Sequence, residues 1–173
     1  MKRLTALSLS LVVTFLPLAA ARAHVTLERP EAAVGGGYKA IFRVPHGCSE
    51  SPTVKVRVRI PEGVIGVKPM PKAGWQLEPV KAKYDKPYQM YHSTLTEGVR
   101  EVTWTGKLLD ENYDEFVLST YLAEDLKPDT ILYFPVVQEC ETGVHRWIEI
   151  PEAGKSEELR EPAPRVKLLP RRP

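Results

Sequence analysis

The sequence predicts an all-β protein built as an antiparallel β-sandwich. Apolar and polar residues alternate along several short runs, glycines and prolines separate these runs, and no segment sustains a 3.6-residue apolar period. The clearest run is TVKVRVRI, in which aliphatic side chains from Val54 to Ile60 lie on one face and Lys55, Arg57 and Arg59 on the other. About seven such runs with turns at short intervals are typical of a sandwich.

The expected strands follow one another along the chain with a turn signal between most neighbours. In order, they cover residues 38–44, 53–60, 75–84, 100–106, 115–122, 131–137 and 145–150. The turn signals are the glycines 35–37 and the short sequences PHG, PEG, KAG, KPD and ETG. No segment between the strands carries the capped apolar pattern of a helix.

Residues 1–23 have the features of a secretory signal peptide. Lys2 and Arg3 precede an apolar run that is too short to be a good membrane span, and Ala21-Arg22-Ala23 supplies the small-x-small cleavage pattern. We expect cleavage after Ala23 and a periplasmic or secreted protein that starts at His24.

The mature chain is long enough for one domain, expected at residues 24–153. The signal peptide carries three basic residues and no acidic ones, so the net charge of +2 for the whole sequence becomes −1 without it. This balance gives no reason to expect a nucleic-acid partner, and no second apolar run of membrane length follows. Residues 154–173 are charged and proline-rich, which predicts a flexible tail.

The two cysteines of the chain are Cys48 and Cys140. An even count in an exported protein favours one disulfide, which in the chain-entropy model stabilises by roughly 4–5 kcal/mol for a loop of about 90 residues. A thiolate metal site is the alternative, but the paired CxxC spacing of structural zinc is missing.

A free N-terminal histidine is a bidentate metal chelator. The α-amine and the imidazole Nδ1 of His24 would close a six-membered ring on one ion, and an α-amine loses its proton far more easily than a lysine does. Two nitrogens and an oxygen suit tetragonal Cu(II). The alternative is that some residue must follow the cleavage site and that it happens to be histidine.

The mature start HVTLERPEAAVGGGYKAIFRVPHGC resembles the YcnI-like family of exported copper-binding domains. The stretches KPMPKAGWQLE, WTG, YDEF and GVHRWIEI are similar to that family in the same order, over roughly residues 24–152. The resemblance implies an immunoglobulin-like β-sandwich that binds Cu(II) through a single-histidine brace. Its ligand groups are an N-terminal histidine and one glutamate, with a tryptophan nearby.

Transferred by motif, the resemblance implies that His24 is the ligand histidine, Glu115 the carboxylate and Trp147 the adjacent wall. Asp114 is the alternative to Glu115, because a register slip of one residue exchanges the faces of a strand; Glu111 is a weaker candidate. The resemblance does not extend to the membrane anchor or second copper-chaperone module that many relatives carry after this domain.

His145 lies two residues before Trp147, so both side chains share a face of a regular strand. It is a candidate extra ligand or hydrogen-bond donor to the site, or an ordinary strand histidine. His46 and His92 lie in expected loops without ligand-like spacing.

The expected function is non-enzymatic binding of Cu(II), for sequestration or for transfer to a separate copper chaperone or copper transporter. The mature chain has only Met70 and Met90 as possible thioether ligands, so Cu(II) is preferred over Cu(I). No GxSxG, HExxH or phosphate-loop motif is present. The alternatives are an envelope interaction module without metal and, with His145 completing three nitrogens, an oxidative copper enzyme.

Overall fold

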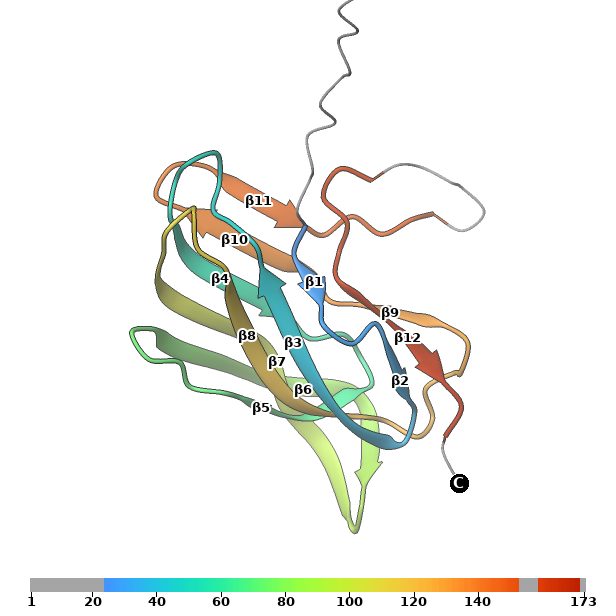
Figure 1. The fold of residues 1–173 in the computed structure, drawn as a ribbon. Coiled ribbons are helices and arrows are strands. Elements are labelled where there is room, and N and C mark those ends of the chain that lie inside the picture. Colours follow the sequence, from blue (N-terminus) through green and yellow to red (C-terminus); the bar gives the residue numbers. More distant parts are fainter. Residues whose placement is uncertain (1–23, 153–158, 172–173) are drawn as a thin grey trace, which may run out of the picture.

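The computed structural model describes residues 24–152 and 159–171, in which all regular structure is β-strand. The expected signal peptide 1–23 lies outside these residues. The strands are β1 (Thr26–Leu27), β2 (Glu31–Ala33), β3 (Gly36–Val44), β4 (Thr53–Arg59), β5 (Val64–Pro69), β6 (Gln76–Met90), β7 (Ser93–Leu108), β8 (Asp114–Leu122), β9 (Ile131–Tyr133), β10 (Val136–Cys140), β11 (Val144–Trp147) and β12 (Arg165–Leu169). The predicted all-β class is therefore confirmed (Figure 1).

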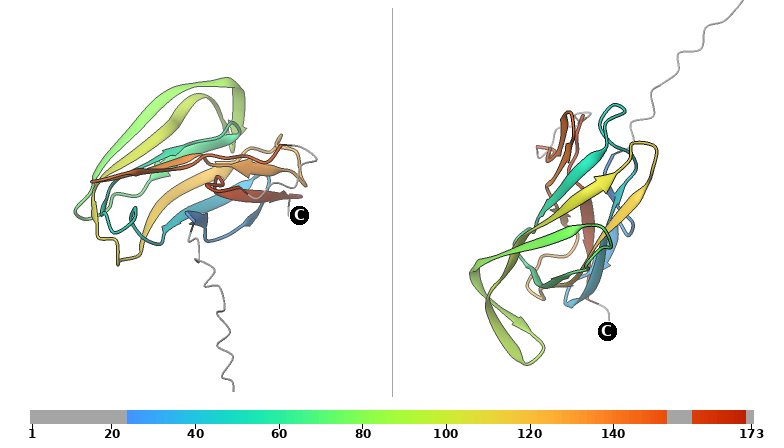
Figure 2. Two further views of the ribbon diagram at one scale, coloured as in Figure 1. Left: turned by 90° about the horizontal axis from the view of Figure 1, so that it is seen from above. Right: turned by 90° about the vertical axis from the view of Figure 1, so that its left-hand side faces the viewer.

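Two larger sheets form the layers of the sandwich (Figures 1 and 2). One has the strand order β1-β3-β8-β5 and the other β11-β10-β4-β7-β6, and every neighbouring pair in both is antiparallel. The alternating residues of each strand send one set of side chains between the layers. Phe42 and Phe116 of the first sheet and Val58 and Trp104 of the second are almost completely buried there.

The two sheets end on edge strands that lie near each other in space. β1 is the edge of the four-stranded sheet, β11 is the edge of the five-stranded sheet, and the ring of His24 just before β1 contacts the ring of Trp147 on β11. His24 is thereby placed at the side of the sandwich where β1 and β11 form the edges of the two sheets.

The prediction of a flexible tail at residues 154–173 is wrong for the part that contains residues 165–169. Residues 165–169 form β12, the central strand of a third sheet of order β2-β12-β9, and Val166 and Leu168 are fully buried. The average composition of the segment concealed the alternation in RVKLL, which buries two aliphatic side chains against the core. The domain therefore extends beyond residue 153, and residues 153–158 and 172–173 lie outside the described part of the chain.

The predicted disulfide is confirmed. Cys48 and Cys140 are bonded, with their Cα atoms 6.0 Å apart, and tie the loop before β4 to the end of β10. No helix of the described residues is long and apolar enough to cross a membrane.

Candidate metal centre

A cleft of about 430 Å³ opens where the segment around His24 meets β11. His24 and Trp147 meet edge to face there, with ring centroids 5.4 Å apart and planes inclined by 63°. The cleft is lined by His24, His46, His145, Trp147, Glu149, Arg160 and Glu161. Three imidazoles, including that of His24, and two carboxylates from distant parts of the sequence thus converge in this cleft.

Strand β11 positions two of these residues by its alternation. His145 and Trp147 lie on the inner face of the strand. Val144 and Arg146, which alternate with them, are exposed. His145 stacks on Trp147 with ring centroids 4.9 Å apart and planes inclined by 29°. The predicted shared face of His145 and Trp147 is confirmed.

A buried glutamine holds the indole of Trp147 in place. Trp147 Nε1 donates to Gln138 Oε1 at 3.0 Å, and Gln138 Nε2 donates to the carbonyl of His46 and to Thr53 Oγ1, both at 2.7 Å. Gln138 is 1% exposed, and all three of its partners lie on different segments. It therefore fixes the loop of His46 relative to the cleft wall.

Glu161 joins the segment before β12 to strand β11. Its Oε1 accepts from His145 Nδ1 at 2.6 Å, and its Oε2 accepts from the backbone N–H of Arg146 at 2.8 Å. Burial alone would raise the pKa of Glu161, but these hydrogen bonds and the nearby charges of His145 and Arg146 bring it below its ordinary value. Glu161 is therefore ionised at neutral pH and acts only as an acceptor.

Glu149 is tied to the same segment through backbone and side chain. Its Oε2 accepts from the N–H of Glu161 at 2.9 Å, its N–H donates to the carbonyl of Glu161, and its carbonyl accepts from Ala163. Glu149 also borders a neighbouring cleft of about 470 Å³, which His24 shares. It is the carboxylate that lines both clefts bordered by His24.

The structure does not bring Glu115 to this site, in contrast to what the resemblance implied. Glu115 lies on β8 and contacts the hydroxyl of Tyr113 and the guanidinium of Arg43. Thr26, Arg43 and Glu115 are aligned across three neighbouring strands, so β3 separates Glu115 from β1 by about 10 Å.

The two alternative carboxylates lie elsewhere as well. Asp114 pairs with Lys72 at 2.5 Å, and Glu111 is exposed.

Among the described residues, no preformed cage of side chains for a metal ion surrounds His24. Within the described part of the chain, His24 Nε2 is buried and has no hydrogen-bond partner. Among the described residues, no group of three His, Cys, Asp or Glu side chains has the spacing to hold a metal ion. A tight site at His24 would therefore need the α-amine as a donor, and only cleavage before His24 makes that amine available.

No motif or spacing in the sequence identifies Glu149 or Glu161 as residues of this cleft. His46 is expected in a loop, and nothing in the sequence assigns it to a site. Glu149 and Glu161 are brought together near His24 by the bridge between Glu149 and Pro162. His46 is held near them by the disulfide of the neighbouring Cys48. The inward position of Gln138 in the strand VVQEC is the one signal that could have pointed to the site, because a polar residue there must find partners.

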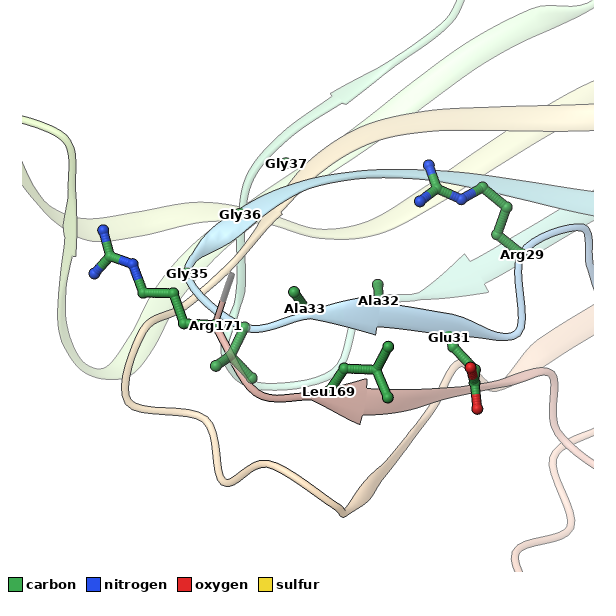
Figure 3. A pocket seen from close by; sticks show the side chains of 10 residues that line it. Arg29, Glu31, Ala32, Ala33, Gly35, Gly36, Gly37, Leu169 and Arg171 are labelled. Carbon is green, nitrogen blue, oxygen red and sulfur yellow. The ribbon is translucent and has the colours of Figure 1, made fainter. Parts of the chain in front are cut away.

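A larger cleft of about 710 Å³ lies at the opposite end of β3, around the glycines 35–37 (Figure 3). Arg29, Glu31 and Arg171 supply its charged side chains, and Arg171 is paired with Glu124 at 2.9 Å. None of the described residues that line it is a histidine or a cysteine. This cleft therefore does not offer the nitrogen donors found at His24.

Comparison with known proteins agrees with the fold. The chain is similar to an uncharacterized protein from Nocardia farcinica, whose crystal structure is described as having an immunoglobulin-like fold. The two sequences are 26% identical, and the TM-score is 0.63. The alignment covers 84% of this chain and 98% of that one, so the sandwich is of the immunoglobulin-like type. No curated protein matches the chain significantly. Residues 24–168 match the model of a domain of unknown function, DUF1775, the domain of the YcnI family, and the chain belongs to this family.

Proposed function

We propose that the protein is exported, is cleaved before His24, and binds Cu(II) through the free amine and the imidazole of that histidine. Copper is its cargo, held for sequestration or for transfer to a separate chaperone or transporter. The protein acts on it by binding and not by catalysis.

The observation that carries this proposal is the position of His24. The residue that follows the cleavage signal lies against Trp147 in a cleft that also contains Glu149 and Glu161. An amine, an imidazole and a carboxylate oxygen are the donor set that suits Cu(II). The cysteines are joined in a disulfide, so they cannot act as thiolate ligands for Cu(I).

Glu149 is the carboxylate best placed to complete the chelate, because it borders both clefts that His24 borders. Trp147 would cover one side of the ion and limit the entry of further ligands. Its indole cannot rotate freely, because Gln138 holds its N–H.

The test compares the protein that starts at His24 with a matched protein that has one glycine before it. Both are titrated with Cu(II) against a competing chelator, with quenching of tryptophan fluorescence as the signal. We expect the free-histidine form to bind one Cu(II) roughly 100-fold more tightly, since the extension turns the amine into an amide and removes one donor. Equal affinities would rule out the chelate, and an absence of binding in both would favour an envelope interaction module.

A further inference from the structure

We propose that a cleft between the tip of the β6–β7 hairpin and the glycines 35–37 binds a neutral carbohydrate. Its volume is about 420 Å³, within the range of small-molecule sites. The hairpin tip and the turn that precedes β3 lie at the same end of the molecule (Figures 1 and 2). Such binding goes beyond the proposed Cu(II) chelate and does not depend on it. His24 precedes β1, which pairs with residues 42–43 of β3, whereas the glycines lie at the start of that strand, and residues 37 and 43 are about 20 Å apart.

Tyr91 is presented at the tip of the hairpin in a strained conformation. Met90 pairs with Ser93, so Tyr91 and His92 form a two-residue turn. Tyr91 has a φ of 53°, and the φ of His92 is not positive. Turns with a positive φ at the first position alone favour glycine there, and a bulky aromatic residue is an outlier. Tyr91 is also 75% exposed, so burial in the core does not offset the strain, and the combination indicates a binding role.

A second tyrosine supports the ring of Tyr91. The ring centroids of Tyr91 and Tyr121 are 5.4 Å apart, and the planes are inclined by 61°. Tyr121 is buried, and its hydroxyl donates to the carbonyl of Gly35 at 2.9 Å. Tyr121 is therefore a fixed support, and most of the Tyr91 side chain remains open to a ligand.

Gly36 and Gly37 keep another side of the cleft free of side chains. Neither has a positive φ, so the backbone conformation does not require glycine. A Cβ atom on Gly37 would meet nothing within 4 Å, and one on Gly36 would meet only the carbonyl oxygen of Ala33, at 3.7 Å. Packing therefore does not require glycine at either position. The missing side chains instead let a ligand approach the backbone of β3, next to Arg171 (Figure 3).

The other side chains of the cleft determine the class of ligand. Gln89, His92, Glu124 and Arg171 supply both hydrogen-bond donors and acceptors. Glu124 and Arg171 are paired at 2.9 Å, so their charges cancel locally, which favours a neutral ligand over an anion or a cation. None of the described residues that line the cleft is aliphatic, which disfavours a lipid or an apolar peptide.

A sugar ring matches this combination of groups. One face of a pyranose presents C–H groups, which pack on the π-face of an aromatic ring such as that of Tyr91. The hydroxyls around its rim both donate and accept hydrogen bonds, as the amide of Gln89 and the Glu124–Arg171 pair can do in return.

The test uses the protein that starts at His24, without added metal, and three neutral trisaccharides as probes: maltotriose, cellotriose and triacetylchitotriose. Each is titrated while ¹H–¹⁵N spectra are recorded. We expect at least one of them to shift the amide signals of Tyr91, Gly36 and Gly37 saturably and to leave those of residues 144–147 at the copper cleft unchanged. No shift with any of the three, or shifts only outside the cleft, would overturn the proposal.

Tyr91→Gly separates binding from folding. It should weaken binding by roughly tenfold, because the stacking face is lost. The midpoint of urea unfolding should stay the same or rise, because glycine adopts the positive φ without strain. Tyr91→Phe keeps the stacking face and should retain binding. Full binding by Tyr91→Gly would contradict the role of the ring.

Gly37→Val tests the open side of the cleft. The added side chain meets no protein atom at its Cβ, so the variant should fold, and it should weaken binding because it fills space that the ligand needs. Tyr113→Ala, which removes another exposed tyrosine at the opposite end of β8, is the matched control and should bind like the parent. Equal binding by Gly37→Val and the parent would place the ligand elsewhere. Because no metal is present, these results are independent of the copper titrations.

Discussion

At the scale of single residues, most side chains that line the cleft at His24 are held in place by hydrogen bonds to other residues of the protein. Trp147 is held by Gln138, His145 by Glu161, and Glu149 by the backbone of Glu161. Pre-arranged partners lower the entropy lost when an ion is bound. His24 is the exception, since its buried Nε2 has no partner and its amine depends on cleavage.

The carboxylate of the proposed copper site can be identified by a substitution that removes the charge and keeps the shape of the side chain. Glu149→Gln should weaken Cu(II) binding of the protein that starts at His24 by about tenfold, because a neutral amide oxygen is a poorer ligand than a carboxylate. Glu115→Gln is the matched control and should leave the affinity unchanged. Competition titration measures both, and the reverse order of effects would return the carboxylate role to Glu115.

Gln138 should be important for stability as well as for the cleft. Gln138→Leu leaves the N–H of Trp147 and the hydroxyl of Thr53 without their partner in a buried place, at a cost of about 2–3 kcal/mol. Gln89→Leu removes an exposed hydrogen bond to Thr94 and should cost less than about 0.5 kcal/mol. Urea unfolding compares the two, and equal losses would contradict a special role for the buried amide.

The local part of the site could be predicted from the sequence, and the distant part could not. His145 and Trp147 share a face because alternation within one strand determines it. Glu115 was transferred from a motif, but its distance from His24 depends on strand order, and β3 lies between them. Glu149 and Glu161 meet through a long connection that no local pattern encodes.

At the scale of elements, the short strands around the chain ends complete the sandwich. The expected strands at 38–44 and 115–122 correspond closely to β3 and β8, because both are runs of seven or eight residues rich in β-branched and aromatic side chains. β1 and β2 have only two and three residues, which is too few for a periodic signal, and the alternation of β12 lies within a charged, proline-rich segment. The segment predicted as a tail therefore supplies the central strand of the third sheet.

The contribution of β12 can be measured by comparing two neighbouring residues. Leu168→Ala should destabilise the protein by about 2–5 kcal/mol, since the side chain is fully buried. Lys167→Ala, on the opposite face of the same strand, should cost less than about 0.5 kcal/mol. Thermal and urea unfolding provide the values. A negligible effect of Leu168→Ala would mean that the strand is not part of the folded domain.

At the scale of the whole molecule, the site exists only because distant parts of the chain are brought to one open side of the sandwich. The segment before β1 supplies His24, and the loop that contains Cys48 supplies His46. Strand β11 supplies His145 and Trp147, and the segment before β12 supplies Glu161. The Cys48–Cys140 disulfide links two of these distant parts, which are 92 residues apart in the sequence.

Removal of the disulfide should therefore affect the global stability. The double variant Cys48→Ser, Cys140→Ser should unfold about 2–5 kcal/mol more easily, because the unfolded chain regains the freedom that the cross-link removes. Urea unfolding of oxidised parent and variant measures the difference. A loss below about 0.5 kcal/mol would show that the unfolded chain gains little from release of the cross-link.

In the proposed function, signal cleavage creates the copper ligand. Electron paramagnetic resonance of one equivalent of Cu(II) tests this most directly, on the protein that starts at His24 and on the glycine-extended protein. We expect a single tetragonal signal with nitrogen and oxygen ligands in the first and a clearly different or absent signal in the second. Identical spectra from the two proteins would contradict a ligand made by cleavage.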